Sequence, residues 1–153
     1  MLVTETSADK KISVLIEADV VKDNDLAVIL EENIPKELKT VTVHPFSYVM
    51  FEANTLLGAD IFIVGESNAE KYIESFVPLQ ATDEYEYLLL NGVPYGIKIY
   101  DHVSKTGSAT EYISYGDEDY YLFFGSRSVH LGALNDSKDG YAFDIAKKII
   151  KTK

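Results

Sequence analysis

Hydrophobic residues in the first half of the chain gather in short runs that are separated by amphipathic stretches. Runs rich in β-branched residues predict strands over residues 11–16, 40–44 and 59–64. Between the first two strands, apolar residues recur with a helical spacing, which predicts a helix over residues 24–34. A similar spacing predicts a second helix over residues 46–57. The order is therefore strand, helix, strand, helix, strand.

Capping and turn residues mark the ends of these elements. Residues 23–25 (DND) are good N-cap residues before the first helix, and Gly58 is placed to end the second. Residues 67–70 (SNAE) match the capping box, which predicts a further short helix that ends near Ser75. The pair 91–92 (NG) indicates a tight turn between two strands.

The second half of the chain alternates less regularly. Strands are predicted over residues 88–90, 97–100, 111–115 and 120–124, and the last of these is the most aromatic run in the sequence. One apolar stripe along residues 139–151 predicts a closing amphipathic helix.

This order of elements predicts an α/β fold. Strands joined through helices pair in parallel, so we expect a three-layer α/β/α sandwich with a mostly parallel sheet. The second half has room to add one or more antiparallel strands. The chain has 153 residues, the size of one domain. We expect a disordered tail over residues 1–10 and a single α/β domain over residues 11–153.

The ordered set of segments also resembles one lobe of the type 2 periplasmic binding proteins, an extracellular solute-binding family. The resemblance depends on the strand at residues 59–64, which begins with Ala-Asp-Ile, on residues 77–79 (VPL) and on residues 95–97 (YGI). It implies an extracellular or cell-surface binding protein. Residues 100–118 are too few to form the second lobe of such a protein, so the resemblance implies a single-lobe or truncated version. No ligand residue of the family carries over to this sequence.

Charge and composition exclude several kinds of partner. The net charge of −11, from 25 acidic and 14 basic residues, disfavours nucleic acid and anionic lipid. The chain has no cysteine, so disulfides, thiolate metal sites and cysteine nucleophiles are excluded. No apolar run approaches the roughly 20 residues of a membrane-spanning helix, and we expect no direct membrane insertion. The first ten residues do not form a signal peptide, so an exported protein would have its leader or anchor outside this sequence.

The carboxyl ends of the predicted parallel strands are the expected binding surface, because ligands of open α/β sheets bind there. Acidic residues follow the first strand, and such a rim attracts a cation or an amine; the alternative is a solvated loop that caps a helix, which the sequence favours. The exposed amides at the start of the helix at Ser67 indicate a weak anion site. The candidate ligand-binding residues are Glu17, Asp19, His44, Ser47, Glu66 and Ser67.

Catalytic and metal chemistry have weaker support. Ser126, Ser128 and His130 lie close together, but no nucleophile-elbow motif is present, and we favour a structural role in which Ser128 or His130 ties a loop by hydrogen bonds. His44 and His102 are not within metal-ligand spacing of each other or of His130. We therefore predict no catalytic residue and no metal site.

Three further features of the sequence bear on function. No glycine-rich phosphate loop is present, so we predict no cofactor. Residues 117–119 (DED) lack the calcium-loop pattern and fit a turn between strands. Most of the 11 tyrosines lie in the second half, where they fit half-buried strand positions better than a dedicated interaction surface.

The leading functional hypothesis is a non-enzymatic extracellular binding or interaction module whose partner is a protein or glycan surface. One alternative is a small-molecule binder of sugars, amino acids or peptides that is completed by dimerisation. A second alternative is a small hydrolase that uses Ser128 and His130. The oligomeric state does not follow from the sequence.

Overall fold

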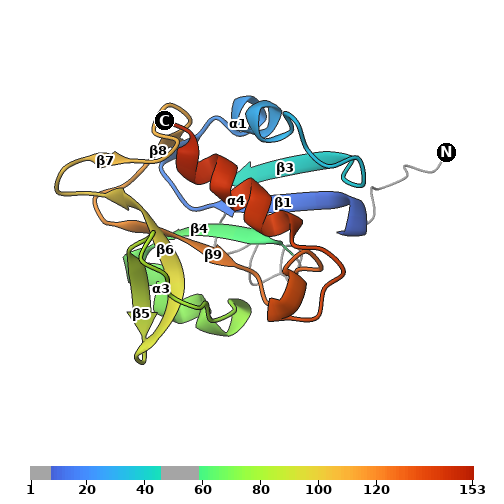
Figure 1. Cartoon of the computed structure of the whole chain (residues 1–153). Coiled ribbons are helices and arrows are strands. Elements are labelled where there is room, and N and C mark those ends of the chain that lie inside the picture. Colours follow the sequence, from blue (N-terminus) through green and yellow to red (C-terminus); the bar gives the residue numbers. More distant parts are fainter. Residues whose placement is uncertain (1–7, 46–58) are drawn as a thin grey trace.

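A computed structural model describes residues 8–45 and 59–153 (Figure 1). The predicted helix at 46–57, its stop at Gly58 and the candidate residue Ser47 lie outside the described residues, as does most of the predicted tail. The last three residues of that tail, Ala8–Lys10, form one turn of 3-10 helix (η1).

Among the described residues, seven strands form one sheet. Their order is β3, β1, β4, β9, β6 and β5, with β7 paired to β6. In that order the strands are Thr40–Pro45, Lys11–Ile16, Ile61–Gly65, Tyr120–Phe124, Val93–Asp101, Tyr87–Leu90 and Thr106–Gly107. Two short strands, β2 (Val20–Val21) and β8 (Ile113–Ser114), pair separately in antiparallel fashion.

The sheet is mixed, which makes the domain an α/β fold, as predicted. Strands β3, β1 and β4 are parallel, whereas β9, β6 and β5 each run antiparallel to the preceding strand of the sheet. Strands β5 and β6 form a hairpin whose turn is Asn91-Gly92, with φ of 53° and 78°. Two successive residues with positive φ are typical of the tight hairpin turn that the sequence predicted.

The helices predicted at residues 24–34 and 139–151 are shorter than expected, whereas the one predicted to end near Ser75 does so but divides into an α-helical and a 3-10 part. After η1, the helical segments of the described residues are α1 (Asp23–Leu30), α3 (Glu66–Ala69), the 3-10 segments η2 (Glu70–Ser75) and η3 (Gly132–Leu134), and α4 (Tyr141–Lys151). Helix α1 ends four residues early, and Asn33 beyond it has a φ of 57°, which a continuing helix cannot adopt.

The two predicted N-caps are wrong. Lys22 occupies the N-cap of α1, and Asp23 lies inside the first turn, where its carboxylate accepts the amide of Asn24 at 3.0 Å. Gly65 occupies the N-cap of α3, so Ser67 is the second residue of that helix. Local sequence matched the capping pattern, but a residue from a distant loop binds Ser67 instead, as described below.

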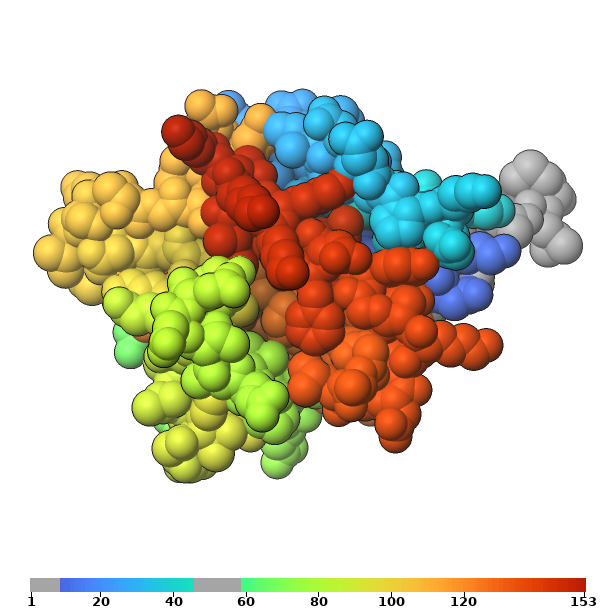
Figure 2. Space-filling view, viewed as in Figure 1, coloured from blue at the N-terminus to red at the C-terminus, as the bar shows by residue number. Residues whose placement is uncertain are grey.

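The core lies on both faces of the sheet, because successive strand residues point in opposite directions. Strand β4 is buried over its whole length, as its continuous apolar run predicted. One face of the sheet packs with residues of α1 and α4, and the other packs with Ala69 of α3 and Tyr72 of η2. Helix α4 crosses the front of the sheet in Figure 1, and its exposed side is the red ridge in Figure 2.

Candidate functional site

The carboxyl ends of β1, β3 and β4 lie at one edge of the sheet, because these strands are parallel. This edge carries the predicted residues Glu17, His44, Glu66 and Ser67. We call it the acidic end, and it also receives the loop between β8 and β9. His44 is exposed at the end of β3, where it pairs in register with Leu15.

Glu17 ties the end of β1 to the end of β4. One carboxylate oxygen accepts the Gly65 amide at 3.0 Å, and the other accepts the Asn68 side-chain amide at 2.7 Å. The sequence placed Glu17 on a ligand surface. The structure instead uses both of its oxygens internally, so Glu17 positions α3.

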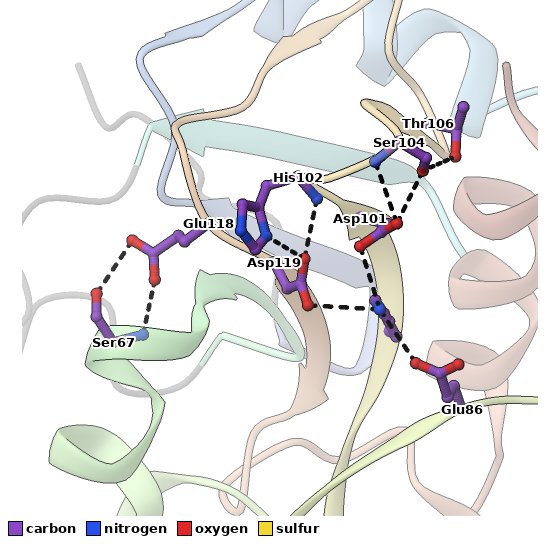
Figure 3. A network of polar contacts seen from close by, with 9 residues as sticks. Ser67, Glu86, Asp101, His102, Ser104, Thr106, Glu118 and Asp119 are labelled. Atoms are coloured by element: carbon purple, nitrogen blue, oxygen red, sulfur yellow. Dashed lines mark hydrogen bonds and ion pairs between the residues drawn. The ribbon is translucent and has the colours of Figure 1, made fainter.

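Glu118 occupies the start of α3. Its carboxylate accepts the backbone amide of Ser67 at 2.7 Å and the Ser67 hydroxyl at 3.0 Å (Figure 3). A carboxylate at this position satisfies a helix N–H that lacks an intrahelical partner. The weak anion site predicted at Ser67 therefore holds a carboxylate of the chain itself. No local pattern links two residues that are 51 positions apart, and the sequence analysis missed Glu118.

A second cluster surrounds Lys98 on β6. The ammonium of Lys98 lies 3.1 Å from Glu86, 3.5 Å from Asp101 and 3.4 Å from Asp119. Asp119 also accepts the His102 backbone amide at 2.9 Å and contacts the His102 ring Nδ1 at 2.7 Å (Figure 3). A network at the edge of the acidic end is thus formed by Glu86, Lys98, Asp101, His102 and Asp119. We call it the Lys98 network.

These contacts shift the pKa values of the network. Burial alone would raise the pKa of Asp119, but hydrogen bonds from the amide and ring of His102, together with Lys98, lower it to about 2. The hydrogen bond to Glu86 raises the pKa of Lys98 above its ordinary value. The hydrogen bond to Asp119 raises the pKa of His102. The network therefore favours a charged Lys98 and an ionised Asp119 at neutral pH.

Carboxylate oxygens of Asp101 and Asp119 and a ring nitrogen of His102 lie within 4.8 Å of one another. A metal ion could bridge atoms at this separation. The ammonium of Lys98 already contacts both carboxylates and supplies the positive charge that an ion would bring. The cluster is therefore satisfied as an ion-pair network.

A cavity of about 340 Å³ opens beside this network. Asp19 and Asp117 are exposed carboxylates on its lining, and Tyr100 and Tyr115 contribute two rings stacked at 4.3 Å. The Tyr115 hydroxyl donates to the Ser108 carbonyl at 2.7 Å, which holds the ring in place. Its lining consists of Asp19, Tyr100, His102, Lys105, Tyr115, Gly116 and Asp117. Of the predicted ligand residues that the structure describes, Asp19 is the one on this lining.

Comparison with known protein families finds no family model that matches the chain, and comparison with curated proteins finds no match either. Within residues 8–45 and 59–153, no helix combines the length and hydrophobicity needed to cross a membrane. The functional interpretation therefore depends on the geometry of the site and the chemistry of its side chains.

The serine and histidine considered for hydrolysis lie elsewhere, in the loop after β9. Ser128 is buried; its hydroxyl donates to Asp60 at 2.5 Å and accepts the backbone amide of His130 at 3.1 Å. The His130 ring contacts Asp139 through Nδ1 at 2.7 Å. The two side chains therefore face different carboxylates, and their bonds tie the loop to the residue before β4 and to the segment before α4. This is the structural role that the sequence favoured.

The His102–Asp119 contact gives a pH-dependent prediction. Replacing Asp119 with asparagine is expected to lower the pKa of His102 toward its ordinary value, because the carboxylate that favours the imidazolium is lost. Since the wild-type pKa is raised, this contact stabilises the fold fully below the unfolded value of 6.5, and the effect is lost as pH rises through the folded value. Histidine NMR titration measures the shift.

Asp139→Asn is the matched control for that titration, because Asp139 contacts the ring of His130 and is not among the carboxylates that raise the pKa of His102. The pKa of His102 should be unchanged in Asp139→Asn. An unchanged pKa of His102 in Asp119→Asn would show that Asp119 does not stabilise its charged form.

Proposed function

We propose that this protein is a non-enzymatic binding module that recognises a cationic group at its acidic end. The cationic group belongs to a small amine or to a basic side chain on a protein partner. The proposal refines the expectation of a binding surface at the carboxyl ends of the parallel strands.

The cavity beside the Lys98 network carries this proposal. It combines two exposed carboxylates, Asp19 and Asp117, with the stacked rings of Tyr100 and Tyr115. Carboxylates attract a cation, and tyrosine rings pack against its apolar body and favour positive charge near their faces. Lys105 on the same lining is exposed, which leaves it able to move away from an incoming ammonium.

An anchored loop and the acidic charge of the chain also favour binding of a cation at this cavity. Near it, Glu118 and Asp119 bond to α3 and to His102, so the β8–β9 loop is anchored immediately after Asp117. An anchored loop lowers the entropy lost when a ligand binds. The excess of acidic residues in the whole chain adds long-range attraction for a cation.

The wider assignment follows the resemblance to one lobe of a type 2 periplasmic binding protein. Under this proposal the whole domain is a three-layer α/β/α sandwich, and the protein works outside the cell or at its surface. Helices packed on both faces of the sheet support the layered arrangement. The location is supported by the resemblance alone.

Titration with spermidine, followed by calorimetry at low salt, tests the proposed function. We expect saturable binding that weakens about tenfold in the Asp19→Asn/Asp117→Asn double variant, because two exposed ion pairs are worth roughly 0.2–1 kcal/mol each. Added salt should weaken the binding further. Succinate, which carries the opposite charge, should not bind.

Asp83→Asn/Asp136→Asn is the matched control, because both residues are exposed and lie outside the cavity lining. Like the site variant, it removes two negative charges from the chain, but it does not touch the site. Equal loss in the control and the site variant would mean that net charge, and not this cavity, binds the amine. Absence of saturable spermidine binding would contradict the proposal.

A further inference from the structure

A second cavity, of about 250 Å³, lies on the face of the sheet that α4 covers. Its walls come from α4, from β6 and β9, and from the segment at residues 79–87. In Figure 2 it corresponds to the hollow between the red surface of α4 and the lime-green segment beside it. It shares no lining residue with the cavity at the acidic end.

The interior of this α4 cavity is apolar. Ile97 and Phe124 come from the sheet, and Phe143, Ala146 and Ile150 come from one side of α4. The rings of Phe124 and Phe143 are 4.8 Å apart, which fixes one wall. An apolar cavity of roughly 150 Å³ is large enough to bind benzene. The α4 cavity therefore has room for one aromatic ring and a short chain.

The polar groups of the cavity include Thr82, Glu84 and Lys147, which are all exposed and so lie at its rim. The Thr82 hydroxyl bonds to the Tyr87 hydroxyl at 3.1 Å. Burial, together with the nearby carboxylate of Glu84, raises the pKa of Tyr85. Lys147 is exposed on α4, and none of the ion pairs recorded within the described part of the chain includes it.

We propose that the α4 cavity binds a small aromatic monocarboxylate. The ring enters the space between Phe124, Phe143 and Ala146, where its transfer from water is favourable. The carboxylate remains at the rim and pairs with the ammonium of Lys147. Charge complementarity favours an anion at this point of the rim, because none of the ion pairs recorded for the described residues includes the Lys147 ammonium. This site is independent of the proposed amine site.

Three probes of similar size separate the apolar and ionic parts of the proposal. Phenylacetate, benzyl alcohol and phenethylamine are each titrated into the ¹⁵N-labelled protein, and amide chemical shifts are followed by NMR. We expect saturable shifts of α4 and β6 amides with phenylacetate, and about fivefold weaker binding of benzyl alcohol, which lacks the single exposed ion pair. Phenethylamine should bind weakest at these amides.

Two variants test the site itself. Lys147→Gln should reduce phenylacetate affinity about fivefold, to that of benzyl alcohol, since it removes the ion pair and keeps the apolar walls. Ala146→Leu should fill the cavity and abolish binding of both probes. Lys151→Gln is the control, because Lys151 is an exposed lysine of the same helix that does not line the cavity.

Binding at the cavity and the position of the carboxylate are tested separately. No saturable shift at α4 and β6 with phenylacetate would overturn the proposal. Equal affinity for all three probes, or equal effects of Lys147→Gln and Lys151→Gln, would overturn the assignment of the carboxylate. Because Lys147 is exposed, Lys147→Gln is expected to fold. The proposal can therefore be tested even if Ala146→Leu fails to fold.

Discussion

Replacing Phe123 with alanine is expected to lower the free energy of unfolding by about 3–5 kcal/mol, the usual range for a buried phenylalanine. Phe123 is a fully buried residue of β9 and stacks on Phe76, with ring centroids 4.3 Å apart. Its ring also lies where a side chain at Gly96 would have to sit, at 2.6 Å from an added Cβ. The sheet backbone cannot collapse easily into the space that alanine would leave.

Phe123→Leu is the matched variant, since it keeps most of the apolar volume and is expected to cost less than about 1.5 kcal/mol. Urea denaturation followed by circular dichroism measures both. Phe123 packs on the face that also buries Ala69 and Tyr72, so hydrogen exchange of α3 should rise in the alanine variant. A loss below 1.5 kcal/mol for Phe123→Ala would show that this face is loosely packed.

Replacing Asp60 with alanine is the second large effect, with an expected loss of about 3 kcal/mol. Asp60 is buried just before β4, and its carboxylate accepts the Ser13 amide at 2.8 Å and the Ser128 hydroxyl at 2.5 Å. Each buried donor left without an acceptor costs about 1–3 kcal/mol. The carboxylate joins β1, β4 and the loop after β9, so its loss affects three segments.

Asp60→Asn separates hydrogen bonding from charge, because asparagine keeps one acceptor oxygen. Burial raises the pKa of Asp60, although the hydrogen bonds from Ser128 and Ser13 oppose the shift. A raised pKa means that the protonated form favours folding, so wild type loses stability relative to Asp60→Asn as pH rises through that pKa. Urea denaturation from pH 4 to pH 8 measures the difference; equal stability of Asp60→Ala and wild type would rule out this role.

Much of the parallel half of the sheet could be predicted from sequence. The runs at residues 11–16, 40–44 and 59–64 form β1, β3 and β4 with shifts of one or two residues, because each pattern is local. The aromatic run at residues 120–124 is β9 and is buried along its length. Its antiparallel place beside β4 depends on pairs of residues at least 55 positions apart in sequence, which periodicity does not encode.

The candidate site was predictable in position but not in detail. Parallel strands bring their carboxyl ends together, so the sequence correctly placed Glu17, Glu66 and Ser67 at the same edge of the sheet. The roles of two of these residues differ from the expectation, because Glu17 and Ser67 bond within the chain. Tyr100 and Tyr115, which the sequence assigned to ordinary packing, line the cavity that carries the proposed function.

The sequence by itself determined the elements and the faces they bury, since hydrophobic periodicity reports directly which side of a strand or helix avoids water. Tertiary structure alone decided which carboxylates remain available to bind a ligand. Glu118 and Glu17 look as exposed in sequence as Asp19 and Asp117, yet the first two bind backbone amides near α3 and the last two face a cavity. The physical reason is that a carboxylate takes whichever donors the fold brings within about 3 Å, and those donors come from distant parts of the chain.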